Sequence, residues 1–463
     1  MNPYTKPYYF LYSLPIVLWG YFNELPVPII LGEVVFAILC IFTDYSKGSK
    51  EISFITVYSA FTLVYCYGNY MVVSSIGTKD EMLYDYYLVK ENIPEGLFFT
   101  YLANVFCVLG FYYYRQKIKK TIGPFYMMNI DLNKKWINYI NMAMIAGNIL
   151  LLAGNVPYGI LFPFLISTLF FLTRYAVKND DKWLITLCVV NTYILSINGL
   201  LFDYLRMSTI APVIAFLIAA FFGKGNVSVL FKKMMYPIYG LLISCVLVFS
   251  FIGQIRNKAS GYEKFTSVVE ELNKTILEEN EPVDFNEEEE EESFEARVSN
   301  INQTSQVVRV VEEDGYYGGA TMAYLTYAFI PRFLWKDKPI IAQGVWFALR
   351  IGKAYIHEGG GANNSINMTS AGELYMNFGI IGVAVGMFLI GGICAYMWQI
   401  SGFTESANNI LGGMFGLYLF YLATSTFGID LQFFVTMISY FCIFQFANFA
   451  YIYFVSSQRK NNA

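Results

Sequence analysis

Apolar stretches long enough to cross a lipid bilayer recur along the whole chain. A transmembrane helix needs about 20 mostly apolar residues, and the sequence contains about twelve such stretches. They cover residues 6–22, 26–43, 52–73, 94–114, 136–154, 157–174, 183–200, 207–223, 234–253, 374–398, 408–426 and 430–456. Of the 463 residues, 56% are apolar and only 14% are charged, well below the roughly 25% charge of soluble domains. The sequence therefore predicts an all-α polytopic integral membrane protein. It argues against a soluble enzyme, a disordered chain or a nucleic-acid binder.

The basic residues between these stretches are distributed unevenly. If the N-terminus lies in the cytoplasm, the inside segments hold seventeen Lys and Arg, whereas the short outside connections hold three. Cytoplasmic loops of membrane proteins carry an excess of Lys and Arg. We therefore expect both termini in the cytoplasm and an even number of helices.

One connection is much longer than the others and defines the expected organisation. Residues 254–371 contain no convincing span and carry 11 basic and 19 acidic residues. The orientation places this loop outside the cell, between nine helices in 1–253 and three in 372–463. Within it, residues 278–295 hold eleven acids and no base. Such a run repels itself and stays solvated, so we expect an acidic insert without a catalytic group.

Basic residues gather on the outer side of the predicted topology. A turn bounded by Pro331 and Pro339 carries Arg332 and Lys338 beside Trp335. Prolines and aromatic packing hold charges in place. The alternative is an interfacial anchor, with aromatics at headgroup depth and bases reaching water. Four further arginines fall on this side: Arg206, Arg256, Arg297 and Arg309. Clustered arginines suit phosphate or pyrophosphate, because the guanidinium bonds two oxygens at once.

The run from Gly372 to Gly379 leads into the tenth expected helix and places Glu373 and Asn377 at its mouth. Polar groups there cost little if they face water, whereas inside the membrane they are costly and usually functional. Alternatively, Glu373 serves the helix dipole. No metal site is predicted, because the chain has a single histidine, His357, and its seven cysteines lack zinc-ligand spacing.

Two of these runs resemble known signatures. The run 330–339, Ile-Pro-Arg-Phe-Leu-Trp-Lys-Asp-Lys-Pro, resembles the Pro-Arg-x-Leu-Trp-x-x-Lys-Pro signature of Wzy-type O-antigen and capsule polymerases. The run 372–382 is similar to their second signature, Gly-Glu-x-Tyr-x-Asn-Phe-Gly-x-x-Gly. The region of Arg206 is similar to an arginine segment that polymerases and O-antigen ligases share. The chain departs from the family in its acidic insert, and from ligases because Glu358 follows His357 where they have a His-Asn pair.

The resemblance implies a GT-C-like membrane fold and a glycosyltransferase at the outer face of the bacterial cytoplasmic membrane. The growing glycan would pass from undecaprenyl pyrophosphate onto a newly flipped lipid-linked repeat unit, without a cofactor. A flippase and a chain-length regulator are expected partners, and nucleic acid is not. Pyrophosphate binding is implied for Arg332, Lys338, Arg206, Arg256, Arg309 and Arg297. Catalytic roles are implied for Arg332, Glu373 and His357, and sugar contacts for Tyr375, Asn377 and Trp335.

Three other functions remain open from the sequence. An O-antigen ligase would pass finished glycan to a different acceptor. A lipid-linked oligosaccharide flippase is expected to have internal repeats, charges within spans and short loops, so the 118-residue loop counts against it. A non-enzymatic scaffold would use the loop to bind partners.

Overall fold

The computed structural model describes residues 10–46, 54–77, 88–121, 134–152, 158–202, 206–224, 299–328, 330, 335, 337–339, 342–356 and 365–401. Every element named within these ranges is an α-helix or a 3-10 helix. The chain divides into two compact units. The first comprises residues 1–125, 289–400 and 418–463, and the second comprises 126–288 and 401–417.

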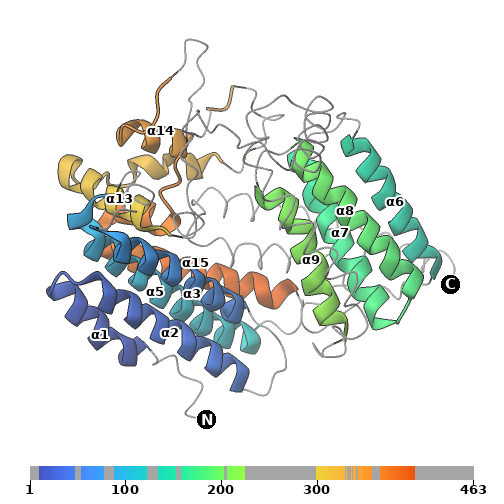
Figure 1. Cartoon of the computed structure of the whole chain (residues 1–463), viewed down its shortest axis with the longest axis horizontal. Coiled ribbons are helices and arrows are strands. Elements are labelled where there is room, and N and C mark those ends of the chain that lie inside the picture. Colours follow the sequence, from blue (N-terminus) through green and yellow to red (C-terminus); the bar gives the residue numbers. More distant parts are fainter. Residues whose placement is uncertain are drawn as a thin grey trace, which may run out of the picture. The chain divides into compact units, whose positions relative to one another are not determined.

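Five long helices form the body of the first unit (Figure 1). They are α1 (Phe10–Phe22), α2 (Pro26–Ser46), α3 (Phe54–Ser75), α5 (Ile93–Thr121) and α15 (Ser370–Ser401). Helix α2 packs against α1, α3 and α5. Large apolar side chains also point outward, including Trp19, which is 58% exposed, and Ile381, which is 77% exposed. Exposed apolar side chains of this size suit contact with lipid.

Helices α5 and α15 approach each other closely where glycines face the partner backbone. A Cβ atom at Gly110 would lie 2.0 Å from the carbonyl oxygen of Phe388. A Cβ atom at Gly391 would lie 2.0 Å from the carbonyl oxygen of Cys107. Small residues allow this kind of backbone contact between membrane helices. The two glycines therefore fix how α15 lies along α5.

Polar side chains also link the helices inside this apolar bundle. The amide of Asn104 on α5 donates to the carboxyl group of Glu33 on α2, and it accepts from the hydroxyl of Tyr58 on α3. All three residues are buried. Hydrogen bonds between helices join membrane helices where no water competes for the polar groups, so this network ties α2, α3 and α5 together.

Four short helices of the first unit cluster at one end of α5 and α15. They are η2 (Lys90–Asn92), α13 (Ile301–Asp314), η3 (Ala320–Thr326) and α14 (Gln343–Arg350). Helix α13 packs against α5 and η2. The described residues of 254–371 are therefore ordered against the membrane-length helices, whereas the acidic segment 278–295 lies outside the described residues.

The second unit contains α6 (Lys134–Leu152), α7 (Tyr158–Lys178), α8 (Lys182–Phe202) and α9 (Arg206–Lys224). Helices α7, α8 and α9 pack against one another, and α6 packs on α7 and α8. Their core is apolar, with Leu169, Cys188 and Phe216 fully buried. Buried asparagines link α6 to α8, because Asn148 Nδ2 donates to Asn191 Oδ1 at 3.1 Å.

The all-helical prediction is confirmed for the described part of the chain. Nine of the expected spans coincide with α1, α2, α3, α5, α6, α7, α8, α9 and α15. The expected spans 234–253, 408–426 and 430–456 lie outside the described residues. Among the described helices two are long and apolar enough to cross a membrane, Lys90–Lys117 and Ser370–Gln399. The arrangement of twelve spans therefore stays a prediction.

Candidate functional site

A break in α15 organises the polar end of the first unit. Gly379 has φ 65° and ψ −157°, outside the helical region. A residue in this conformation interrupts the i to i+4 bonding of a helix. Two backbone N–H groups from another segment bond to carbonyls just before the break: Tyr317 N donates to Met376 O at 3.0 Å, and Gly318 N donates to Asn377 O at 3.1 Å. The break therefore docks the chain around residue 317 onto α15.

Two side chains of α15 extend this attachment to η3. Asn377 Oδ1 accepts from Gly319 N at 2.8 Å, and Asn377 Nδ2 donates to Thr321 Oγ1 at 2.7 Å. One turn earlier, the hydroxyl of Tyr324 donates to Glu373 Oε2 at 2.8 Å. Glu373 is 0% exposed and Tyr324 is 1% exposed. Glu373 therefore lies in the first turn of α15, which begins at Ser370, and its side chain is buried.

Tyr375 joins α15 to the start of α5. Its hydroxyl donates to Glu95 Oε1, and its ring stacks on Phe99 with centroids 4.6 Å apart. The ring of Tyr316 packs edge-on against the ring of Tyr375, with centroids 6.2 Å apart. Since Phe99 and Tyr375 are both buried, the tyrosine anchors the helix pair and places Glu95 beside the break.

Helix α13 lies across the start of α5, held by small and polar contacts. A Cβ atom at Gly96 would meet Thr304 Oγ1 at 2.9 Å, so α13 rests close against α5 at this position. Val89 N donates to Ser305 Oγ at 3.2 Å, and Asn92 Nδ2 donates to Glu312 Oε2 at 3.1 Å. These bonds fix the rotation of α13 about its axis.

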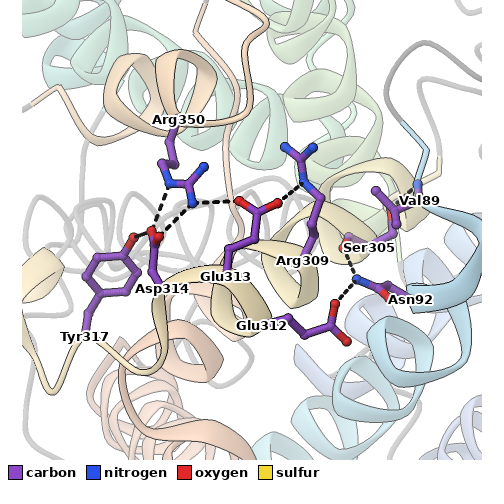
Figure 2. Close-up of polar contacts among 9 residues, drawn as sticks. All are labelled: Val89, Asn92, Ser305, Arg309, Glu312, Glu313, Asp314, Tyr317 and Arg350. Atoms are coloured by element: carbon purple, nitrogen blue, oxygen red, sulfur yellow. Dashed lines mark hydrogen bonds and ion pairs between the residues drawn. The ribbon is translucent and has the colours of Figure 1, made fainter.

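An arginine of α14 clamps the end of α13 (Figure 2). Arg350 donates to both oxygens of Asp314 at 2.8 Å and to Glu313 Oε2 at 2.7 Å. The hydroxyl of Tyr317 also donates to Asp314. Hydrogen bonds from Arg350 and then from Tyr317 lower the pKa of Asp314 to about 2. A bidentate contact of this kind is stronger than a single surface ion pair, so it joins α14 to α13.

We predict that this clamp opens in acid. The pKa of Asp314 is lower in the folded protein than its ordinary value of 3.8, so its contribution is fully present above pH 3.8 and is lost as the pH falls toward 2. Hydrogen exchange, corrected for the pH dependence of the chemical rate, should show α13 and α14 losing protection over that interval. Asp314→Asn removes the titrating group, so its protection should change little there. Equal loss in both proteins would contradict the assignment.

The side chain of Lys338 bonds to backbone carbonyls that precede Arg332 in the sequence. The ammonium of Lys338 donates to Ala328 O at 2.7 Å and to Ile330 O at 2.9 Å. Trp335 is 38% exposed and packs edge-on against Tyr327, with centroids 6.1 Å apart. Lys338 therefore joins the two ends of the segment that contains Arg332.

The first unit brings together several residues singled out from the sequence. Glu373, Tyr375 and Asn377 lie within two turns of α15, and Arg309 lies on α13. Arg309 forms an ion pair with Glu313, with Nε and Oε1 3.7 Å apart. Arg206 is the first residue of α9 in the second unit. The remaining candidates lie outside the described residues: Arg256, Arg297, Arg332 and His357. Among the described residues no group of three or more His, Cys, Asp or Glu is arranged to hold a metal.

Three residues of this region were not foreseen: Glu95, Tyr324 and Arg350. Each is joined to its partner across 36 to 280 positions of sequence. Proline is common in the first turn of a helix, so Pro94 is a signal that could place Glu95 at a helix start. No local pattern points to a tyrosine 280 residues away.

Replacing Gly379 with alanine should destabilise the protein. Its φ and ψ belong to a region that is essentially restricted to glycine and costs other residues about 1–3 kcal/mol, and a Cβ atom there would lie 3.0 Å from the Tyr316 ring. Gly352 is a matched control, because it also has a positive φ, 72°, but nothing lies within 4 Å of its Cβ position. Thermal unfolding in detergent should show a clearly larger loss for Gly379→Ala than for Gly352→Ala. Similar losses would mean that contact with Tyr316 is unimportant.

Comparison with known proteins gives one match. Neither the curated proteins nor the solved structures contain a match to this chain. One family model, a domain of unknown function, matches residues 51–452, which is most of the chain. The chain therefore belongs to the DUF8712 family.

Proposed function

We propose that this protein is a polysaccharide polymerase, a glycosyltransferase that joins undecaprenyl-pyrophosphate-linked repeat units at the outer face of the bacterial cytoplasmic membrane. The observation that carries the proposal is the junction at Gly379. The run that resembles the second polymerase signature forms a buried joint, in which Asn377 and Glu373 hold η3 against α15. The joint places the segment that contains Arg309 and Lys338 at the end of two membrane-length helices.

The proposed setting is a body of about twelve spans with both termini in the cytoplasm. The outward apolar side chains of α1 and α15 support a lipid environment. The distribution of seventeen inside and three outside basic residues supports the orientation. In this orientation the α13–α14 region faces the compartment where flipped, lipid-linked glycan is available.

The proposed reaction transfers the donor sugar without a metal. The acceptor hydroxyl oxygen attacks C1 of the donor sugar, the bond from C1 to the pyrophosphate oxygen breaks, and undecaprenyl pyrophosphate leaves with its charge. Fixed cations lower the barrier where negative charge develops. We assign this role to four residues of the first unit, Arg332, Lys338, Arg309 and Arg297. The pyrophosphate contacts that the resemblance implies for Arg206 and Arg256 of the second unit stay predictions. Guanidinium groups serve well because their fork matches two phosphate oxygens.

The acceptor proton passes to Glu373 in this proposal. Tyr324 already donates a hydroxyl hydrogen to Glu373 Oε2 at 2.8 Å, which is the geometry required of a sugar hydroxyl and its base. Trp335, which is 38% exposed, is assigned to the sugar side of the site, and His357 is a second candidate base. Tyr375 and Asn377, for which the resemblance implies sugar contacts, are buried and already bonded to protein groups, so we assign them to holding the joint.

The lipid-linked glycan of a deletion strain tests this function. Loss of a polymerase should leave one repeat unit per lipid at the outer face, and reintroducing the gene should restore long chains. Mass spectrometry of the extracted glycolipid separates the alternatives. Long chains retained on the lipid would identify a ligase, single units trapped inside would identify a flippase, and unchanged glycan would leave a scaffold role.

A further inference from the structure

Helix α13 carries a row of polar side chains along one side. Thr304 faces Gly96 of α5. Val307 faces Gly372 of α15, where an added Cβ atom would lie 3.1 Å from Val307 Cγ2. Gln303, Gln306 and Arg309 follow at a spacing of three residues, so they lie near one another on one side of the helix. Asn302 precedes them on the same side.

Two groups of this side lack hydrogen bonds within the described part of the chain. Gln303 Oε1 is buried and accepts no hydrogen bond, and Arg309 Nε is buried and donates none. Arg309 Nε does form a longer ion pair, with Glu313 Oε1 at 3.7 Å (Figure 2). In Figure 2 the two terminal nitrogens of Arg309 point away from Glu313. Native proteins leave few buried polar atoms unpaired, and each such atom calls for an explanation.

The chemistry of these groups favours a sugar phosphate. An amide oxygen accepts from sugar hydroxyls, and a guanidinium binds phosphate oxygens. Gln303 and Arg309 are six positions apart, or about 9 Å along the helix axis, a span that one sugar ring and its attached phosphate can cover. A metal cation would meet the positive charge of Arg309, and an apolar ligand would leave the amide oxygen unpaired.

We infer that Gln303, Gln306 and Arg309 form a strip that recognises the sugar bonded to the pyrophosphate, with Gln303 accepting from a ring hydroxyl. The inference rests on the proposed function and adds to it a residue set that selects the sugar. Gln303 touches substrate in the ground state and in the transition state alike, so its contribution belongs to binding and not to the chemical step.

Kinetics of purified full-length protein in proteoliposomes test the strip. The substrate is the single lipid-linked repeat unit extracted from the deletion strain. Gln303→Met keeps the length of the side chain but removes the acceptor, so KM should rise about tenfold while kcat changes much less. Gln303→Glu keeps an acceptor and should recover part of the affinity. Val311→Ile, on another side of α13, controls for altered packing and should leave KM near the wild-type value.

A second measurement needs no variant. Hydrogen exchange of the wild-type protein, with and without the same glycolipid, should show added protection across 299–310. Wild-type KM in an active Gln303→Met protein, or protection confined to other segments, would overturn the strip and leave the polymerase intact. A wild-type protein that neither binds nor extends the lipid-linked unit would overturn both.

Discussion

Replacing Arg332 with alanine should abolish polymer while protein level and membrane insertion stay normal. Loss of one fixed donor that stabilises developing negative charge costs about 10²–10³ in rate. Arg332→Lys should recover little, because a point charge cannot reproduce a two-pronged contact with phosphate. His357→Ala should be milder, since Glu373 and not His357 takes the acceptor proton in the proposed reaction. The ratio of single-repeat to polymeric lipid-linked glycan measures all three variants.

Lys338→Met gives a variant for comparison, because Lys338 has a role in the fold besides the one assigned to it toward pyrophosphate. Because its ammonium joins Ala328 O and Ile330 O, Lys338→Met should loosen the segment around Arg332 and lower both activity and thermal stability. Arg332→Ala should lower activity alone. Wild-type polymer from Arg332→Ala would leave the turn as an interfacial anchor. An inactive His357→Ala beside an active Arg332→Ala would instead favour a base-dependent, ligase-like mechanism.

Glu373→Gln should also stop polymer synthesis without unfolding the protein. Glutamine has nearly the same volume, and its amide oxygen can still accept from Tyr324, so the joint with η3 is retained. The variant cannot take a proton, and loss of a general base typically costs about 10²–10⁴ in rate. Turnover of the extracted lipid-linked unit by purified protein, together with thermal unfolding, measures the two effects separately.

Two further variants separate catalysis from structure at this position. Glu373→Ala removes the acceptor from a buried tyrosine hydroxyl, which costs about 1–3 kcal/mol, so it should be both inactive and less stable. Tyr324→Phe keeps the carboxylate but removes its donor, and we expect about a tenfold loss of activity because the base is held less firmly. If Glu373→Gln proves as active as wild type, the carboxyl group serves only to hold η3.

The sequence alone determined the helical class and the position of most helices. A bilayer demands a run of about 20 apolar residues for each span, and this requirement is local, so it can be read without knowing any neighbour. The expected spans 94–114 and 374–398 thus fall within α5 and α15. Both helices extend beyond the apolar windows, because polar residues such as Arg115 and Glu373 continue the helices past the ends that hydropathy marks.

Only the tertiary structure decided what the polar residues contact. Glycine at 379 and asparagine at 377 marked an unusual region of sequence, but the helix break becomes visible only with the N–H groups of Tyr317 and Gly318 that bond to it. The partners of Glu373 and Asp314, Tyr324 and Arg350, lie 49 and 36 positions away. A hydrogen bond requires a donor and an acceptor about 3 Å apart and correctly oriented. The folding of α13, η3 and α14 onto the helix ends determines this distance and orientation. Composition and sequence spacing do not determine them.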